Sequence, residues 1–232
     1  HYGEWMYIWN ELSMPLGKKQ GYFNMVGGGG AASVTTTKKM YVPLEFWFCR
    51  NVGLALPLIG LQYHEVKVVI QFAEQSVMTY DGSSVGSIGQ LSASLWVDYI
   101  YLDTDERRKF AQSSHEYLIE QLQFTGKETS NTKIKLNFNH PVKELVWVTE
   151  VASGRNKLNW CNYTDDADAI TAVPNDGKYA TWAALLDSSA ATIKNPTKSA
   201  KLTLNGNDRF AKRDGSYFNL IQPFQHHENV PS

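Results

Sequence analysis

The sequence predicts an all-β fold built from β-sandwiches, and three observations lead to this prediction. Short apolar runs typical of strands alternate with long polar segments along the 232 residues. No rhythm of strand, helix and strand, which a parallel sheet would need, runs through the chain. Aromatic residues make up 12% of the sequence, and the seven tryptophans lie mostly in the strand-like runs. The jelly roll, with two four-stranded sheets face to face, is a favoured sandwich because it limits exposed strand edges.

The first elements along the chain are a helix, a loop and two strands. Residues 2–12 place Trp5, Ile8, Trp9 and Leu12 at the spacing of one apolar helix face. Residues 25–39, with four consecutive glycines and a Ser/Thr run, are typical of a flexible loop. Strands are expected at about Leu44–Phe48 and Leu61–Phe72, separated by a segment rich in proline and glycine in which strand pairing must pause.

A third strand and a capped helix follow. The strand Ala93–Leu102 is apolar on both faces, which indicates that it is covered on both sides. Asp103 can cap a helix from Thr104 to about Gln112, and Glu106 completes the capping box. The segment His115–Phe124 is expected to be an extended connector that becomes a strand.

The second half repeats this style with shorter signals. Strands are expected at Ile134–Phe138, Leu145–Val148, Leu202–Leu204 and Tyr217–Ile221. The dipeptide Asn205-Gly206 is the one most favoured in tight hairpin turns. The long polar region between Val151 and Lys198 is expected to be a surface loop.

Composition excludes several classes of protein. The net charge of -1 argues against a dedicated nucleic-acid binder with a large basic face. No run is long enough to span a bilayer, and no signal peptide opens the sequence. Both ends are expected to be cut from a longer chain. Of the two cysteines, Cys49 is expected to be a buried free thiol, and a disulfide to Cys161 is disfavoured.

No pattern of catalytic or metal-binding residues emerges. Residues 82–86 match the nucleophile motif G-x-S-x-G, but the sequence after them does not favour the required helix. None of the six histidines has a partner at metal-ligand spacing, so no metal or other cofactor is expected. The basic run Arg107–Lys109 adjoins acidic residues, which favours a solvated helix face or an ion pair between subunits over nucleic-acid contact.

Several blocks resemble one family when they are read in order. They are the segment from Tyr41 to Lys67 and the runs Ser94–Gln112, Ser114–Gly126, Leu136–Leu145, Leu204–Phe210 and Gly215–Pro223. Together they resemble the major capsid proteins of large eukaryotic double-stranded DNA viruses, such as phycodnaviruses and iridoviruses. Val52 departs from the proline that the family more often has, and the stretch from Val151 to Lys198 has no residue-by-residue match.

The resemblance implies tandem jelly rolls, both incomplete here, with short connecting helices. Residues 1–113 would be the C-terminal part of the first jelly roll, 114–126 a connector, and 127–232 the N-terminal part of the second. The implied role is structural and not enzymatic: a homotrimer forms a pseudo-hexagonal capsomer, and capsomers tile an icosahedral shell with minor capsid proteins and no direct nucleic-acid contact. The protein would assemble inside the host cell and reside in the virion.

This interpretation identifies particular residues as candidates for contacts between domains or subunits. Inter-domain or inter-subunit contacts are expected at Trp96, Tyr99, Tyr101, Tyr117 and Phe124, and the loop from Val151 to Lys198 is expected to project outward. Asn162 fits the N-glycosylation acceptor pattern and is a candidate modification site.

Two other functions remain as alternatives. A glycan-binding β-sandwich would use Trp160, Tyr163 and Trp182. A jelly-roll enzyme would need an acid-base or metal cluster, which the sequence does not show.

Overall fold

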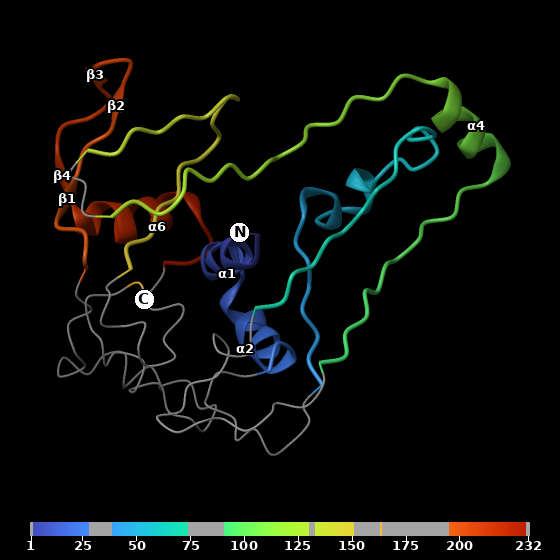
Figure 1. Ribbon diagram of the computed structural model, residues 1–232, viewed down its shortest axis with the longest axis horizontal. Coiled ribbons are helices and arrows are strands. Elements are labelled where there is room, and N and C mark those ends of the chain that lie inside the picture. Colours follow the sequence, from blue (N-terminus) through green and yellow to red (C-terminus); the bar gives the residue numbers. More distant parts are fainter. Residues whose placement is uncertain are drawn as a thin grey trace. The chain divides into compact units, whose positions relative to one another are not determined.

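A computed structural model describes the protein over residues 2–27, 39–73, 91–129, 133–150, 163 and 195–230 (Figure 1). The chain divides into two compact units. One unit comprises residues 1–42 together with 123–232, and the other comprises residues 43–122. The predicted division at residues 113 and 126 into two jelly rolls and a connector stays a prediction.

The predicted N-terminal helix is confirmed as α1, Tyr2–Ser13. Its buried residues are Met6, Asn10 and Leu12, so the face that packs is rotated from the predicted stripe, of which only Leu12 is buried. A second helix, α2 (Leu16–Met25), was not predicted from the sequence. It starts directly after Pro15, and the chain leaves it through Gly27, whose φ of 117° favours glycine.

The predicted hairpin at Asn205-Gly206 is also confirmed. Strands β2 (Thr203–Leu204) and β3 (Asn207–Asp208) pair antiparallel across it. Asn205 and Gly206 have φ angles of 49° and 84°, the combination that a type I′ turn requires. Lys201 Nζ lies 2.9 Å from the Asp208 carboxylate, and its hydrogen bond holds the pKa of that carboxyl below the usual value.

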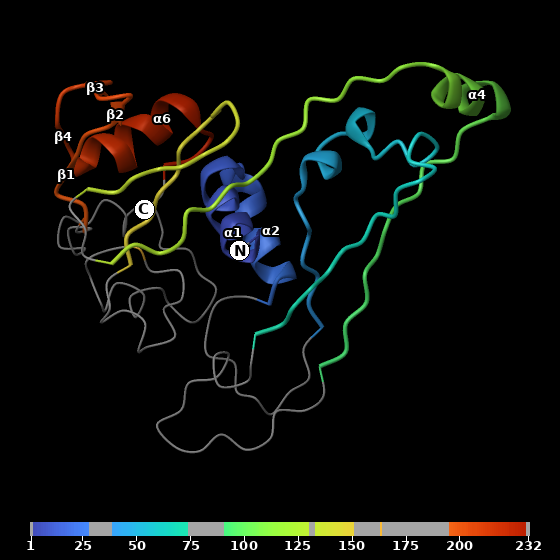
Figure 2. The same cartoon turned by 45° about the horizontal axis from the view of Figure 1, so that its top comes forward.

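A second two-stranded sheet joins the segments on either side of the β2–β3 hairpin. Strands β1 (Ser199–Ala200) and β4 (Arg213–Asp214) pair antiparallel. The pairing is extended by a hydrogen bond of 3.0 Å from Gly215 N to Lys198 O. Figures 1 and 2 both draw these short strands beside α6 (Gln222–His226), which follows the π-helix η4 (Tyr217–Ile221).

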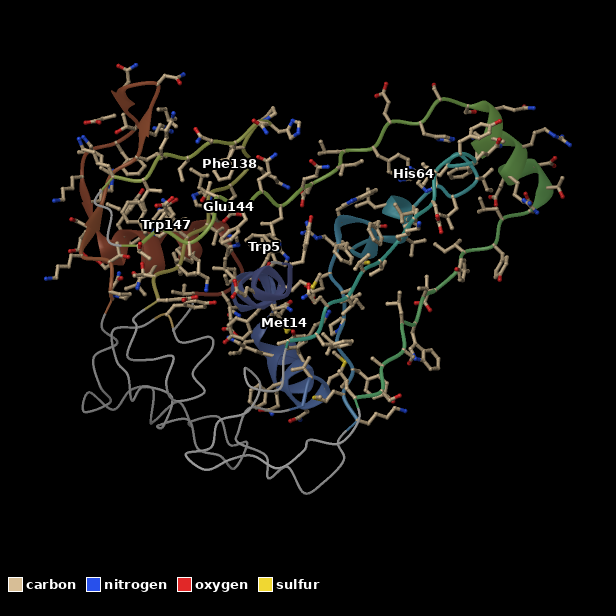
Figure 3. All side chains as sticks on the ribbon, viewed as in Figure 1. Trp5, Met14, His64, Phe138, Glu144 and Trp147 are labelled. Atoms are coloured by element: carbon tan, nitrogen blue, oxygen red, sulfur yellow. The ribbon has the colours of Figure 1, made fainter. Side chains whose placement is uncertain are left out.

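The prediction of a strand at Tyr217–Ile221 is therefore wrong. The helical turn places Phe218 among other aromatic rings, and this packing overrides the strand preference of the sequence. The Phe218 ring centroid lies 5.1 Å from that of Trp147, which Figure 3 labels, and 5.7 Å from that of Phe210.

The described residues of the unit 43–122 form an α-helix and two short 3₁₀ helices. Helix α4 (Thr104–Gln112) begins where predicted, and Asp103 Oδ1 accepts a 2.9 Å hydrogen bond from Glu106 N. The predicted strand Leu44–Phe48 is wrong, because η1 (Trp47–Cys49) begins within it, followed by η2 (Val52–Leu54). This turn brings the rings of Phe46 and Phe48 to a 5.3 Å stack. Cys49 is a free thiol but exposed, so its predicted burial is wrong.

Four other predicted strands have no paired partner within the described ranges. They are 61–72, 93–102, 134–138 and 145–148. The paired strands of the described part are the two-residue elements β1 to β4. Sheet formation depends on partners distant in sequence, and the apolar alternation of a segment does not supply them. The arrangement of strands in two four-stranded sheets, which defines a jelly roll, thus stays a prediction.

Candidate functional site

The described residues contain no cluster of side chains suited to holding a metal ion. No group of three or more His, Cys, Asp or Glu side chains gathers there as a metal site would. No helix among those residues is long and apolar enough to cross a membrane. Several predicted features lie outside the described ranges: the G-x-S-x-G segment, Asn162, and the sugar-binding candidates Trp160 and Trp182. The predicted outward loop also lies outside them up to residue 194, except for Tyr163, which is half-buried.

The most prominent surface feature is an exposed apolar run at residues 91–102, which Figure 1 draws as a long stretch leading into α4. Trp96 is 88% exposed, Tyr99 66% and Tyr101 91%. Leu95, Val97 and Ile100 are exposed as well, so exposed apolar side chains occur at both odd and even positions of the run. The sequence predicted that both faces of this segment are covered, and in the isolated chain neither face is. These are the apolar side chains that a partner surface would remove from water.

A second exposed run, at residues 64–72, belongs to the same unit. Val66, Val68, Ile70 and Phe72 occupy alternate positions and are all exposed, and so is Val69 between them. Among the described residues, no backbone–backbone hydrogen bond joins 65–73 or 91–102 to another segment. Within the described part of the chain, the runs 65–73 and 91–102 therefore combine exposed apolar side chains with backbone groups that pair with no other described segment, as a template for strand pairing does.

The connector after α4 is anchored to the η1 turn within this unit. The Arg50 Nη1 and Glu120 Oε2 atoms lie 2.5 Å apart. One turn earlier in η1, the Trp47 ring meets the ring of Tyr117 edge-on, with 6.2 Å between the centroids. Sequence reasoning missed this contact, because 70 positions separate Arg50 from Glu120 and no local pattern links them.

The five predicted contact residues thus have different surroundings. Trp96, Tyr99 and Tyr101 lie together on the exposed run 91–102. Tyr117 is half-buried against Trp47 of its own unit. Phe124, near the C-terminal end of the connector and in the other unit, is 48% exposed. Three of the five, which are neighbours in the sequence, are thus exposed, and the structure adds a partner for Tyr117 alone among the five.

Comparison with known proteins covers the whole chain. The profile of a family described as "Large eukaryotic DNA virus major capsid protein" matches residues 106–232. A second, described as "Major capsid protein N-terminus", matches residues 1–103.

Individual relatives agree with both profiles. The major capsid protein of Pyramimonas orientalis virus is 51% identical over 239 residues, covering 100% of this chain and 50% of the relative. That of Paramecium bursaria Chlorella virus 1 is 43% identical, covering 97% of this chain and 54% of the relative. The chain spans about half the length of these two curated relatives.

A solved structure is similar as well. A chain described as "PBCV-1 virus capsid, quasi-atomic model" matches with a TM-score of 0.74 and 39% identity, covering 100% of this chain and 58% of that one. The likeness extends from the first residues through both units, in fold as well as in sequence. The chain belongs to the family of major capsid proteins of large eukaryotic DNA viruses.

Proposed function

We propose that this chain is part of a structural protein that builds the capsid shell of a large eukaryotic DNA virus. The observation that carries the proposal is the match over the full chain to a virus capsid structure, with a TM-score of 0.74. The protein is assembled inside the host cell and resides in the virion.

The finer proposal concerns how the shell is built. Residues 1–113 and 127–232 belong to two successive jelly rolls, joined by a connector at 114–126. Three copies of such a tandem give six comparable edges, which pack as a pseudo-hexagonal capsomer. The partners are then two further copies of the protein, neighbouring capsomers and minor capsid proteins, with no direct contact to nucleic acid.

The exposed run 91–102 supplies a physical reason for assembly. A tryptophan buries about 200 Å² when it is fully covered. At about 25 cal/mol per Å² and 88% initial exposure, covering Trp96 contributes at most roughly 4 kcal/mol, from which the cost of ordering the interface is subtracted. Tyr99 and Tyr101 add to this term, so the inter-domain or inter-subunit contacts are centred on these three side chains. Tyr117 and Phe124 complete the proposed set.

The test is the native mass of the full-length protein by light scattering at micromolar concentration. A stable trimer supports the proposal, and a clean monomer contradicts it. Trp96→Ser is the matching variant, and Tyr63→Ser is its control, because Tyr63 is a fully exposed aromatic residue of the same unit outside the run. Trp96→Ser is expected to weaken the trimer by tenfold or more, with Tyr63→Ser unchanged.

Thermal unfolding of the same variants separates the two kinds of contact. If Trp96→Ser leaves the trimer intact but lowers the unfolding midpoint, then Trp96 lies between domains of one subunit. If the dissociation constant alone changes, it lies between subunits. Hydrogen exchange of intact particles tests the loop from Val151 to Lys198, and strong protection of its amides would contradict an outward position.

A further inference from the structure

The tip of the β2–β3 hairpin is the only Asn-Gly dipeptide in the sequence, formed by Asn205 and Gly206. Both residues are exposed. A Cβ atom added to Gly206 would have nothing within 4 Å, so the space beside this glycine is open in the described part of the chain. The dipeptide is therefore accessible to water.

Neither reactive group of this dipeptide is engaged in a hydrogen bond within the described ranges. Gly206 N donates none of the backbone hydrogen bonds there, and the Asn205 side chain has no hydrogen-bond partner there. The hairpin around them is short, because each strand has two residues and the last facing pair is Leu204 and Asn207. A hairpin this small opens locally at low cost, which allows the backbone at its tip to rotate.

We propose that Asn205 is a site of spontaneous covalent modification, a deamidation by water through a cyclic imide formed with Gly206. The Gly206 nitrogen attacks Cγ of Asn205, and a C–N bond forms there. The bond from Cγ to Nδ2 breaks, and the proton of the attacking nitrogen leaves with the amide group as ammonia. Water then opens the ring at either of its two carbonyl carbons, which gives aspartate or isoaspartate at position 205.

The glycine at position 206 favours this reaction, because it has no Cβ atom to hinder the approach of its nitrogen. A dipeptide of related chemistry, Asp214-Gly215, is protected by the fold. Gly215 is buried, and its N atom donates a 3.0 Å hydrogen bond to Lys198 O. Asp214 Oδ1 accepts hydrogen bonds of 2.9 Å and 2.7 Å from N and Oγ of Ser216. Both reacting groups are thus held at Asp214-Gly215, whereas both are free at the hairpin tip.

Both products change the hairpin. Each adds a negative charge to a hairpin that already carries Asp208. Isoaspartate also lengthens the backbone by one carbon, so Leu204 and Asn207 can no longer face each other in the present register. The modification is a slow and irreversible change of the hairpin, and it is independent of the proposed capsid role.

The experiment is to incubate the intact protein for weeks in mildly alkaline buffer and then map its peptides by mass spectrometry. Conversion of an amide to a carboxyl group raises the peptide mass, and fragmentation of the backbone distinguishes isoaspartate from aspartate. Asn207 is the matched control, because it is exposed in the same hairpin but is paired with Leu204 and followed by Asp208. Asn205 is expected to react about tenfold faster or more, which corresponds to a barrier lower by about 1.4 kcal/mol. Equal rates at the two asparagines, or an unmodified Asn205, would overturn the proposal.

The same measurement in denaturant tests the contrast between the two glycine dipeptides without any substitution. Unfolding is expected to speed isoaspartate formation at Asp214 by about tenfold or more, because the hydrogen bonds that hold it are lost. The rate at Asn205 is expected to rise much less, since its reacting groups are already free in the folded chain. Equal acceleration at the two sites would contradict the inference that the fold leaves one open and protects the other.

Discussion

Gly215→Ala is expected to destabilise the region around strands β1 and β4 more than an ordinary glycine substitution would. Gly215 is buried where β4 ends, and its amide extends the β1–β4 pairing to Lys198. A Cβ atom at this position would overlap the carbonyl oxygen of Thr197. It would also lie 2.8 Å from the Thr197 carbonyl carbon and 2.7 Å from Asn195 Nδ2. Because two of these three atoms, including the closest, belong to the backbone, they cannot rotate out of the way.

The loss of stability can be worked out from the backbone segments that the added Cβ atom would push apart, those at Gly215 and Thr197. Separating the two backbones costs the Gly215–Lys198 hydrogen bond, about 1 kcal/mol, and the strain of overpacking, about 1–3 kcal/mol. The sum is roughly 2–4 kcal/mol, or a fall in unfolding midpoint of about 4–16 °C for a chain of this size.

Thermal unfolding followed by circular dichroism measures this change, and Gly21→Ala is the matched control. Gly21 lies inside α2 with open space around its α-carbon. The same added methyl group should there stabilise the helix by about 0.5–1 kcal/mol. The reasoning is refuted if Gly215→Ala unfolds within 2 °C of the wild type, or if the two substitutions change the midpoint in the same direction.

Three further outcomes are expected. Asp103→Ala removes the side-chain acceptor for Glu106 N and should destabilise α4 by about 1 kcal/mol, seen as faster amide exchange in its first turn, whereas Asp105→Ala should not. The Lys201 hydrogen bond lowers the pKa of Asp208 below 3.8. The stabilisation of the β2–β3 hairpin by this ion pair is therefore complete above pH 3.8 and lost as the pH falls through the lowered pKa. Cross-strand NMR contacts that persist unchanged at lower pH would contradict this prediction. Phe218→Ala should cost about 2 kcal/mol in denaturant unfolding, because it removes the ring that contacts both Trp147 and Phe210.

The elements predicted correctly from the sequence are those with local signals. The α1 helix has an apolar repeat, α4 has the Asp103 cap, and the hairpin has Asn205-Gly206, all within a few residues. Helix α2 was missed because its ten residues include Gly17 and Gly21, which weaken any helical pattern.

The errors arise where distant packing decides the structure. Aromatic and branched residues at 217–221 favour a strand locally, but contacts of Phe218 with Trp147 and Phe210 accompany a helical turn instead. The same limit applies to the candidate contact surface. The apolar pattern at 91–102 predicted that this segment is covered, but a pattern cannot name the partner or reveal the Arg50–Glu120 contact beside the connector.

Asn229 caps the C-terminal end of α1, because its N and Nδ2 atoms donate hydrogen bonds to Leu12 O and Met14 O, and this cap has a consequence for synthesis. The residue that caps the helix lies 215 positions after Met14, so the ribosome makes one end of this contact long before the other. At roughly 5–20 residues per second, the helix waits about 10–40 s for its cap. A helix of 12 residues is marginal by itself in water. Helix α1 therefore acquires its final stability only after the segment with Asn229 has been made and has packed against it.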